Sequence, residues 1–128
     1  MANPLNLLLD THVLLWWIGA SNHLSEKGLR AIVEAGRIYV SAASVWEASI
    51  KAARGKLTLH GDLTAQIEAH RFTPLAVTFA HAVAAGYLPL HHTDPFDRML
   101  IAQARAESLV LVTADKQLRK YDVPTILV

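Results

Sequence analysis

Short apolar runs recur along the chain, separated by longer segments that combine apolar and polar residues. A short continuous apolar run bounded by polar residues is typical of a strand that a parallel sheet buries on both faces. The runs that we interpret as strands are "LNLLL" (5–9), "RIYVSA" (37–42), "FTPLAV" (72–77), "LVLVTA" (109–114) and "PTILV" (124–128).

The longer segments open on residues that favour a helix N-terminus. The predicted helices cover residues 10–20, 25–36, 44–55, 62–71, 78–88, 94–107 and 115–121. In "SVWE" we expect a capping box, with Ser44 as the N-cap and Glu47 at the third helical position. In "DPFD", Asp94 is the expected N-cap, Pro95 fits the first helical position, and Asp97 faces the positive end of the helix dipole.

Strands and helices alternate almost throughout the chain. This order favours an α/β fold with a mostly parallel central sheet of four or five strands and helices on both faces. The chain has 128 residues, which is the size of one domain, so we expect residues 1–128 to form a single domain.

Composition narrows the classes of protein. The chain is 52% hydrophobic and only 18% charged, so some apolar surface is expected to be covered by a partner. It contains no cysteine, which excludes disulfides and thiolate metal sites and fits a cytoplasmic location. No apolar run approaches the roughly 20 residues of a membrane span, and no signal peptide is visible. The net charge of +1 gives no indication of a strongly basic face for binding nucleic acid.

Five of the 11 acidic residues stand where predicted strands end or predicted helices begin. Asp10 follows the first strand, Asp115 follows the fourth, and Glu47 lies in the first turn after the second. Because the carboxyl ends of parallel strands share one edge, we expect these three acids along it. Asp94 and Asp97 open the helix 94–107, whose first turn can approach the same edge.

Two interpretations of these acids compete. Each acid alone is explained by helix capping, which is worth about 1 kcal/mol and is a sufficient reason for the residue. Capping, however, requires neither acids in particular nor caps that converge on one edge. Converging carboxylates repel and raise one another's pKa values, and a divalent cation removes that penalty. Mg²⁺ and Mn²⁺ favour such oxygen ligands, and ions of this kind suit phosphodiester cleavage.

The chain also resembles a known family. The stretches "LLLDTHVLLWW", "SAASVWEASIKAARGKL", "HHTDPFDRMLIAQA" and "LVLVTADKQL" occur in the order seen in PIN-domain ribonucleases, and more narrowly in VapC-type toxins of bacterial toxin–antitoxin pairs. The resemblance spans residues 5–127. It implies a PIN-like fold, an acidic pocket that binds Mg²⁺ or Mn²⁺, and hydrolysis of RNA. It also implies an antitoxin protein as partner and a homodimer.

The resemblance assigns site residues by position. The family's catalytic and metal-binding acids match Asp10, Glu47, Asp97 and Asp115. Supporting roles are expected for Asp94, Thr11 and Thr113. Many relatives have a further acid after the last aspartate, where this chain has Lys116 and Gln117, so the number of ions stays open.

The basic residues and histidines are less specific. Lys51, Arg54, Arg98 and Lys116 are either solvated charges or contacts to RNA phosphates. The seven histidines show no zinc-binding spacing, and we interpret them as surface or core residues. The remaining alternative is that His92 or His12 contacts the substrate. The alternative function is a non-catalytic α/β binding or signalling module, receiver-like, that uses its acids as helix caps. A receiver, however, needs two acids after the first strand, where this chain has only Asp10.

Overall fold

A computed structural model describes residues 4–128 of the protein. Its centre is a sheet of five strands in the order β3-β2-β1-β4-β5, and each neighbouring pair is parallel. The strands are β1 (Asn6–Leu9), β2 (Arg37–Ser41), β3 (Thr73–Leu75), β4 (Val110–Thr113) and β5 (Thr125–Leu127). The five runs predicted as strands are thus confirmed as elements, each shorter than its apolar run.

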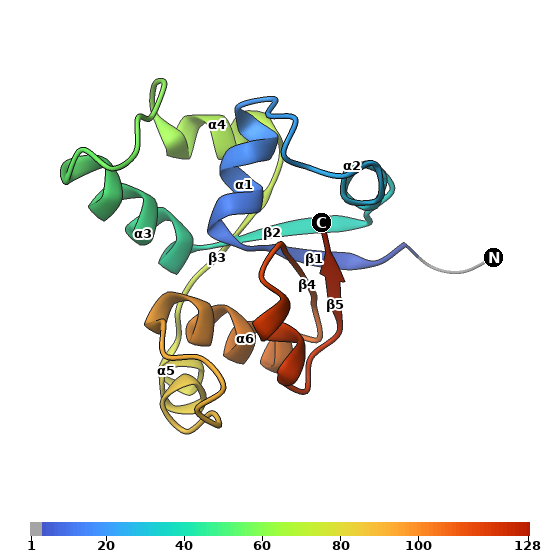
Figure 1. The fold of residues 1–128 in the computed structure, drawn as a ribbon, viewed down its shortest axis with the longest axis vertical. Helices are drawn as coiled ribbons and strands as arrows, with labels where there is room; N and C mark the ends of the chain where they lie inside the picture. Colours follow the sequence, from blue (N-terminus) through green and yellow to red (C-terminus); the bar gives the residue numbers. More distant parts are fainter. Residues whose placement is uncertain (1–3) are drawn as a thin grey trace.

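Helices cover both faces of this sheet. They are α1 (Thr11–Ile18), α2 (Glu26–Val33), α3 (Ala42–Ala53), α4 (Leu63–Ala69), α5 (Phe79–Gly86), α6 (Pro95–Glu107) and the 3-10 helix η1 (Lys116–Lys120). In Figure 1, α1 to α4 lie above the sheet, whereas α5, α6 and η1 lie below it. The predicted α/β fold with helices on both faces is therefore confirmed.

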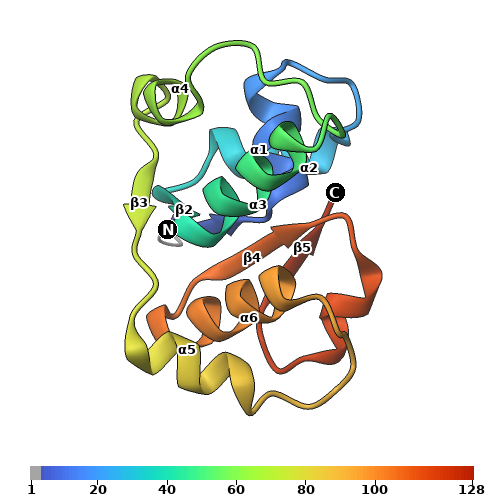
Figure 2. The ribbon, with the colours of Figure 1, turned by 90° about the vertical axis from the view of Figure 1, so that its left-hand side faces the viewer.

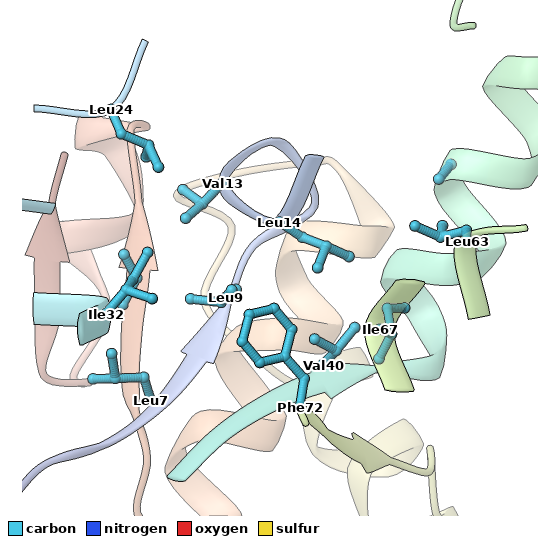
Figure 3. Close-up of a cluster of buried hydrophobic side chains, with 12 residues drawn as sticks. Leu7, Leu9, Val13, Leu14, Leu24, Ile32, Val40, Leu63, Ile67 and Phe72 are labelled. Atoms are coloured by element: carbon cyan, nitrogen blue, oxygen red, sulfur yellow. The ribbon is translucent and has the colours of Figure 1, made fainter. Parts of the chain in front are cut away.

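The central strand β1 explains why the first apolar run has no polar interruption. Because successive side chains of a strand point to opposite faces, Leu7 and Leu9 pack against α1 to α4 while Leu8 packs against α5 and α6. All three are fully buried. Figure 3 shows the first of these two clusters gathered around Leu9, Leu14 and Phe72. The sheet thus separates two cores, and β1 lies at the centre of both.

The predicted start of α3 is wrong. The helix begins at Ala42, and its N-cap is Ser41, whose hydroxyl accepts the backbone N–H of Ala43 at 3.0 Å. Strand β2 therefore runs into α3 without a loop, because Ser41 is both its last residue and the cap of the helix. Ser44 lies buried inside the helix, so "SVWE" is no capping box and Glu47 lies in the second turn.

Residues 4–128 share one sheet, and the single-domain organisation of residues 1–128 stays a prediction. Within the described part of the chain, we find no helix with the length and apolar character needed to cross a membrane.

Candidate acidic site at the carboxyl edge of the sheet

Asp10 occupies the first position after β1, where it caps α1 and is almost fully buried. Its Oδ1 accepts the backbone N–H of Val13 at 2.8 Å, and its Oδ2 accepts the hydroxyl proton of Thr113, the last residue of the neighbouring strand β4. Burial raises the pKa of this carboxyl above its ordinary value, although the hydrogen bond from Thr113 opposes the rise. The strand end therefore holds a carboxylate in surroundings that disfavour its charge.

Helix α6 brings a second pair of acids to the same edge. Asp94 is the N-cap, and its Oδ1 accepts the backbone N–H groups of Phe96 at 2.8 Å and Asp97 at 3.1 Å. The side chain of Asp97 has no such capping bond. Its pKa is raised to about 7, first by burial and then by the charge of Asp94, with smaller contributions from Asp10 and Glu47. The two acids of "DPFD" thus have different environments.

Asp115 comes from the loop after β4. Its Oδ1 accepts the backbone N–H of Gln117 at 2.9 Å and caps η1, while its own backbone N–H donates to the hydroxyl of Thr113 at 3.0 Å. Thr113 therefore contacts both strand-end acids. This leaves Oδ2 of Asp115 free of backbone partners and directed toward His92, whose Nε2 lies 3.1 Å away.

Glu47 reaches the site from α3, and both of its oxygens have partners. Oε1 accepts the hydroxyl proton of Thr11 at 2.6 Å, and Oε2 accepts from the ammonium group of Lys51 at 2.8 Å. Helices α3 and α6 lie side by side (Figure 2). An edge-on contact between Trp46, in the second turn of α3, and Phe96, in the first turn of α6, joins them with ring centroids 5.2 Å apart. The buried Glu47 is therefore close enough to raise the pKa values of Asp10 and Asp97.

Three of the four predicted acids line one pocket. Its volume is about 320 Å³, and its walls are Asp10, His12, Trp16, Asp97, Ala114 and Asp115. Glu47 lies beside this pocket rather than in its wall. Three carboxylates around one space, one of them with a pKa near 7, are a charge arrangement that a hard divalent cation relieves. The donor set consequently fits Mg²⁺ or Mn²⁺.

His92 and Trp16 are two members of the site to which the sequence gave no definite role. One ligand atom each of His92, Asp97 and Asp115 lies within 4.8 Å of the others. The only sequence signal for His92 is its place two residues before the cap of α6. Trp16 lies one helical turn after His12 on α1, which places the indole in the wall of the acidic pocket. Nothing in the sequence placed this residue near the acids.

Arg98 has a role other than the phosphate contact that we considered from the sequence. Its guanidinium is buried and donates to the carbonyl oxygens of Ala85, Gly86, Leu88, Pro89 and His92 at 2.9–3.3 Å. All of these acceptors belong to the end of α5 and the loop between α5 and α6. Arg98 therefore holds this loop against α6, and its guanidinium is engaged with backbone carbonyls.

The other three basic residues differ in their freedom to bind phosphate. Lys51 is half-buried and paired with Glu47. Arg54, at the C-terminus of α3, and Lys116, next to Asp115, are exposed. The structure thus leaves Arg54 and Lys116 as the more accessible candidates.

Comparison with known proteins identifies the family of this chain. The profile of the PIN domain family matches residues 7–124. The chain belongs to the PIN-domain family. It is also 31% identical over 121 residues to Ribonuclease VapC22 of Mycobacterium tuberculosis, a match that covers 92% of this chain and 93% of that protein.

Solved structures of similar fold include VapBC toxin–antitoxin complexes. VapBC2 from Rickettsia felis, bound to a DNA fragment from its promoter, matches with a TM-score of 0.71 and 15% identity, over 97% of this chain and 99% of that chain. DNA-bound VapBC from Salmonella typhimurium matches with a TM-score of 0.70 and 20% identity, over 95% and 97% of the two chains. At these identities the likeness concerns the fold, which confirms the predicted PIN-like architecture.

Proposed function

We propose that this PIN-domain protein is a divalent-cation-dependent ribonuclease and the toxin of a toxin–antitoxin pair. The observation that carries the proposal is the environment of Asp97. Within residues 4–128, the polar contact of its carboxylate is His92 Nε2 at 3.5 Å, and its pKa is about 7 because burial and neighbouring acids disfavour its charge. A site of this kind is unfavourable for folding and suits a bound cation.

In this proposal Asp10, Asp97 and Asp115 hold the ion, with Mg²⁺ or Mn²⁺ as the candidates. A bound ion of this class lowers the pKa of water and stabilises negative charge on the leaving oxygen of a phosphodiester. The chain's own residues keep the carboxylates in place: Thr113 fixes Asp10, Asp94 caps the turn that carries Asp97, and Thr11 with Lys51 fixes Glu47.

The alternative, a binding module that uses its acids only as caps, accounts for part of the site. Asp10, Asp94 and Asp115 each accept backbone N–H groups at a helix N-terminus, as that interpretation requires. It does not account for Asp97, which caps nothing, or for Glu47, which is buried in the second turn of α3. Ribonuclease activity explains all five acids together.

The decisive experiment replaces Asp97 by Asn and measures RNA cleavage with Mg²⁺ or Mn²⁺, with EDTA as the metal-free control. We expect cleavage to be lost while the circular dichroism spectrum is kept. Asp62→Asn is the matched control, because Asp62 caps α4 through Thr64 and Ala65 and does not line the acidic pocket. Full activity of Asp97→Asn would overturn the proposal. Sequencing of RNA 5′ ends after brief expression would identify the RNA that is cut.

Contacts to RNA phosphates are proposed for Arg54 and Lys116, and for Lys51 through the ammonium hydrogens that its bond to Glu47 leaves free. Both exposed residues flank proposed site residues: Lys116 follows Asp115 directly, and Arg54 ends the helix that carries Glu47. Phosphate contacts position a nucleic acid without selecting its sequence, so this arrangement predicts no particular RNA sequence.

The proposed partners are an antitoxin protein and a second copy of this chain. The toxin–antitoxin complexes of similar fold support the first, and co-expression with the product of the neighbouring reading frame tests it. The second is supported by exposed apolar side chains spaced four residues apart on α5 and its C-cap: Phe79, Val83 and Tyr87 have 94%, 61% and 88% of their surface exposed. Light scattering should show a dimer that Val83→Asp shifts toward monomer.

A cytoplasmic location, proposed from the lack of cysteine, is tested by fractionation.

A further inference from the structure

The loop that precedes α6 is fixed at several points. The phenol oxygen of Tyr121 accepts the backbone N–H of His92 at 2.9 Å and donates to the carbonyl of Pro89 at 2.7 Å. Arg98 donates to the carbonyls of Pro89 and His92 at 3.0 and 3.3 Å. Two side chains from different elements therefore hold the backbone of residues 89–92, independently of the imidazole ring.

The contacts of the two ring nitrogens of His92 indicate which of them carries the proton. Nδ1 lies 3.0 Å from the backbone nitrogen of Asp94, which carries a hydrogen and donates it. A proton on Nδ1 would face that N–H, so the ring carries its proton on Nε2. Nε2 lies 3.1 Å from Oδ2 of Asp115 and 3.5 Å from Oδ2 of Asp97. The ring is thus a fixed N–H donor aimed between two carboxylates.

The close approach of His92, Asp97 and Asp115 also suggests a different role, in which the imidazole is itself a metal ligand. Ligation through Nε2 needs a free lone pair there, and therefore a proton on Nδ1. That tautomer would set two donors against each other, 3.0 Å apart, and break the hydrogen bond that accepts the Asp94 N–H at the start of α6. The direct-ligand role is consequently disfavoured by the contacts of the ring's other nitrogen.

We propose that His92 is a positioning residue: it donates its Nε2 proton to Asp115 and directs the positive edge of the ring toward Asp97, so that both carboxylates are oriented and the cation meets only oxygen ligands. This inference rests on the proposed function, because it concerns the same acidic site. Partners of this kind, which touch the ligands instead of the ion, change metal affinity by about 10- to 100-fold when they are removed. The side chain of His92 is 18% exposed, so its hydrogen bond to Asp115 and its contact with Asp97 are partly shielded from water.

Two substitutions of His92 distinguish the role of Nε2 from that of Nδ1. Gln places an amide N–H group near the position of Nε2, whereas Asn places an amide oxygen near the position of Nδ1. We expect His92→Gln to bind Mn²⁺ within about 3-fold of the wild-type affinity, and His92→Asn to bind about 10- to 100-fold more weakly. If the ring mattered only for the turn before α6, His92→Asn would be the better substitute, and that ranking would overturn the proposal.

Electron spin echo spectroscopy of bound Mn²⁺, measured without RNA, supplies a readout independent of activity. The proposal expects no coupling from a directly coordinated imidazole nitrogen in the wild-type protein. Tight Mn²⁺ binding with such a coupling, lost in His92→Gln, would overturn the inference and leave the proposed function standing. Absence of Mn²⁺ binding by the wild type would overturn both. Circular dichroism and thermal unfolding confirm folding of each variant, which the contacts of Tyr121 and Arg98 lead us to expect.

Discussion

Thr113 donates its hydroxyl proton to the buried carboxylate of Asp10, although the two residues are 103 positions apart in the sequence. Strands β1 and β4 are neighbours, and in their register Leu9 lies opposite Val112. Asp10 and Thr113, which follow this pair, therefore lie next to each other at the edge of the sheet. The same hydroxyl accepts the backbone N–H of Asp115, so one threonine connects the two acids that follow these strands.

We expect Thr113→Val to destabilise the cation-free protein by about 1–3 kcal/mol, because a buried carboxylate loses its hydroxyl donor. The pKa of Asp10 should rise further, since the hydrogen bond from Thr113 is the main contribution that lowers it. Urea unfolding measures the first effect and carboxyl NMR the second. Thr113→Ser keeps the hydroxyl and is the control. Equal stability of the Val and wild-type proteins would remove Thr113 from the site.

Asp97 makes the stability of the cation-free protein depend on pH. Its folded pKa is about 7 and its ordinary value is 3.8, so the folded state binds the proton more tightly. The contribution of this group to stability is therefore fully present below about pH 4, falls as the pH rises through 7, and stays low above it. In EDTA, Asp97→Asn should unfold at least about 4 °C above the wild type at pH 8.

At pH 4 the advantage of Asp97→Asn should disappear, because the wild-type carboxyl is then largely protonated. Asp122→Asn, at an exposed position outside the acidic pocket, is the control for the substitution itself. Added Mg²⁺ should stabilise the wild type at pH 8 and leave Asp97→Asn unchanged. A melting curve of Asp97→Asn that follows the wild type at both pH values would contradict the raised pKa.

Much of this fold is local in origin and could therefore be predicted from the sequence. The uninterrupted run of β1 predicts a strand buried on both faces, and Leu7, Leu8 and Leu9 are indeed fully buried. Asp10 and Asp94 are recognisable as caps because each precedes an apolar periodic segment, and both accept the expected backbone N–H groups. The convergence of the acids follows from the rule that parallel strands share a carboxyl edge.

What could not be predicted depends on contacts between distant elements. The start of α3 at Ala42 rests on the direct passage of β2 into the helix, whereas "SVWE" offers an equally good capping box three residues later. The burial of Arg98 follows from carbonyl groups that the loop before α6 presents to it. His92 enters the site because Tyr121, 29 positions away, fixes its backbone. None of these contacts can be recognised from the local pattern of apolar and polar residues.

Glu47 should contribute substantially to activity and be of minor importance for folding. Glu47→Gln keeps an acceptor for the hydroxyl of Thr11, and the lost ion pair with the partly exposed Lys51 is worth less than about 1 kcal/mol. Since both oxygens of Glu47 are already engaged, we expect a loss of about 10- to 100-fold in cleavage rate. The pKa of Asp97 should fall when this neighbouring charge is removed. Activity assays, unfolding curves and NMR titration test the three expectations, and unchanged cleavage would exclude Glu47 from the site.

Arg98 should behave as a structural residue. Arg98→Met keeps most of the aliphatic volume but leaves the carbonyls of Ala85 and Leu88 without their donor in the interior. The cost should be at least about 3 kcal/mol, because each unsatisfied buried group costs about 1–3 kcal/mol. Arg105→Met, at an exposed position of the same helix, is the control and should change stability by less than about 0.5 kcal/mol. Equal stability of the two variants would return Arg98 to the candidates for RNA contact.

The exposed residues Arg54 and Lys116 should instead determine the salt dependence of RNA binding. Measured in the inactive Asp97→Asn protein, replacement of either residue by Ala should reduce the slope of log affinity against log salt by about 0.7, the value for one phosphate contact to a single strand. Lys27→Ala is the control, because Lys27 is exposed on α2 and does not line the acidic pocket. Because phosphate contacts carry no sequence information, the weakening should be the same for RNAs of different sequence. Slopes that match the Lys27→Ala control would place the RNA on another surface and leave the acidic pocket without its proposed flanking contacts.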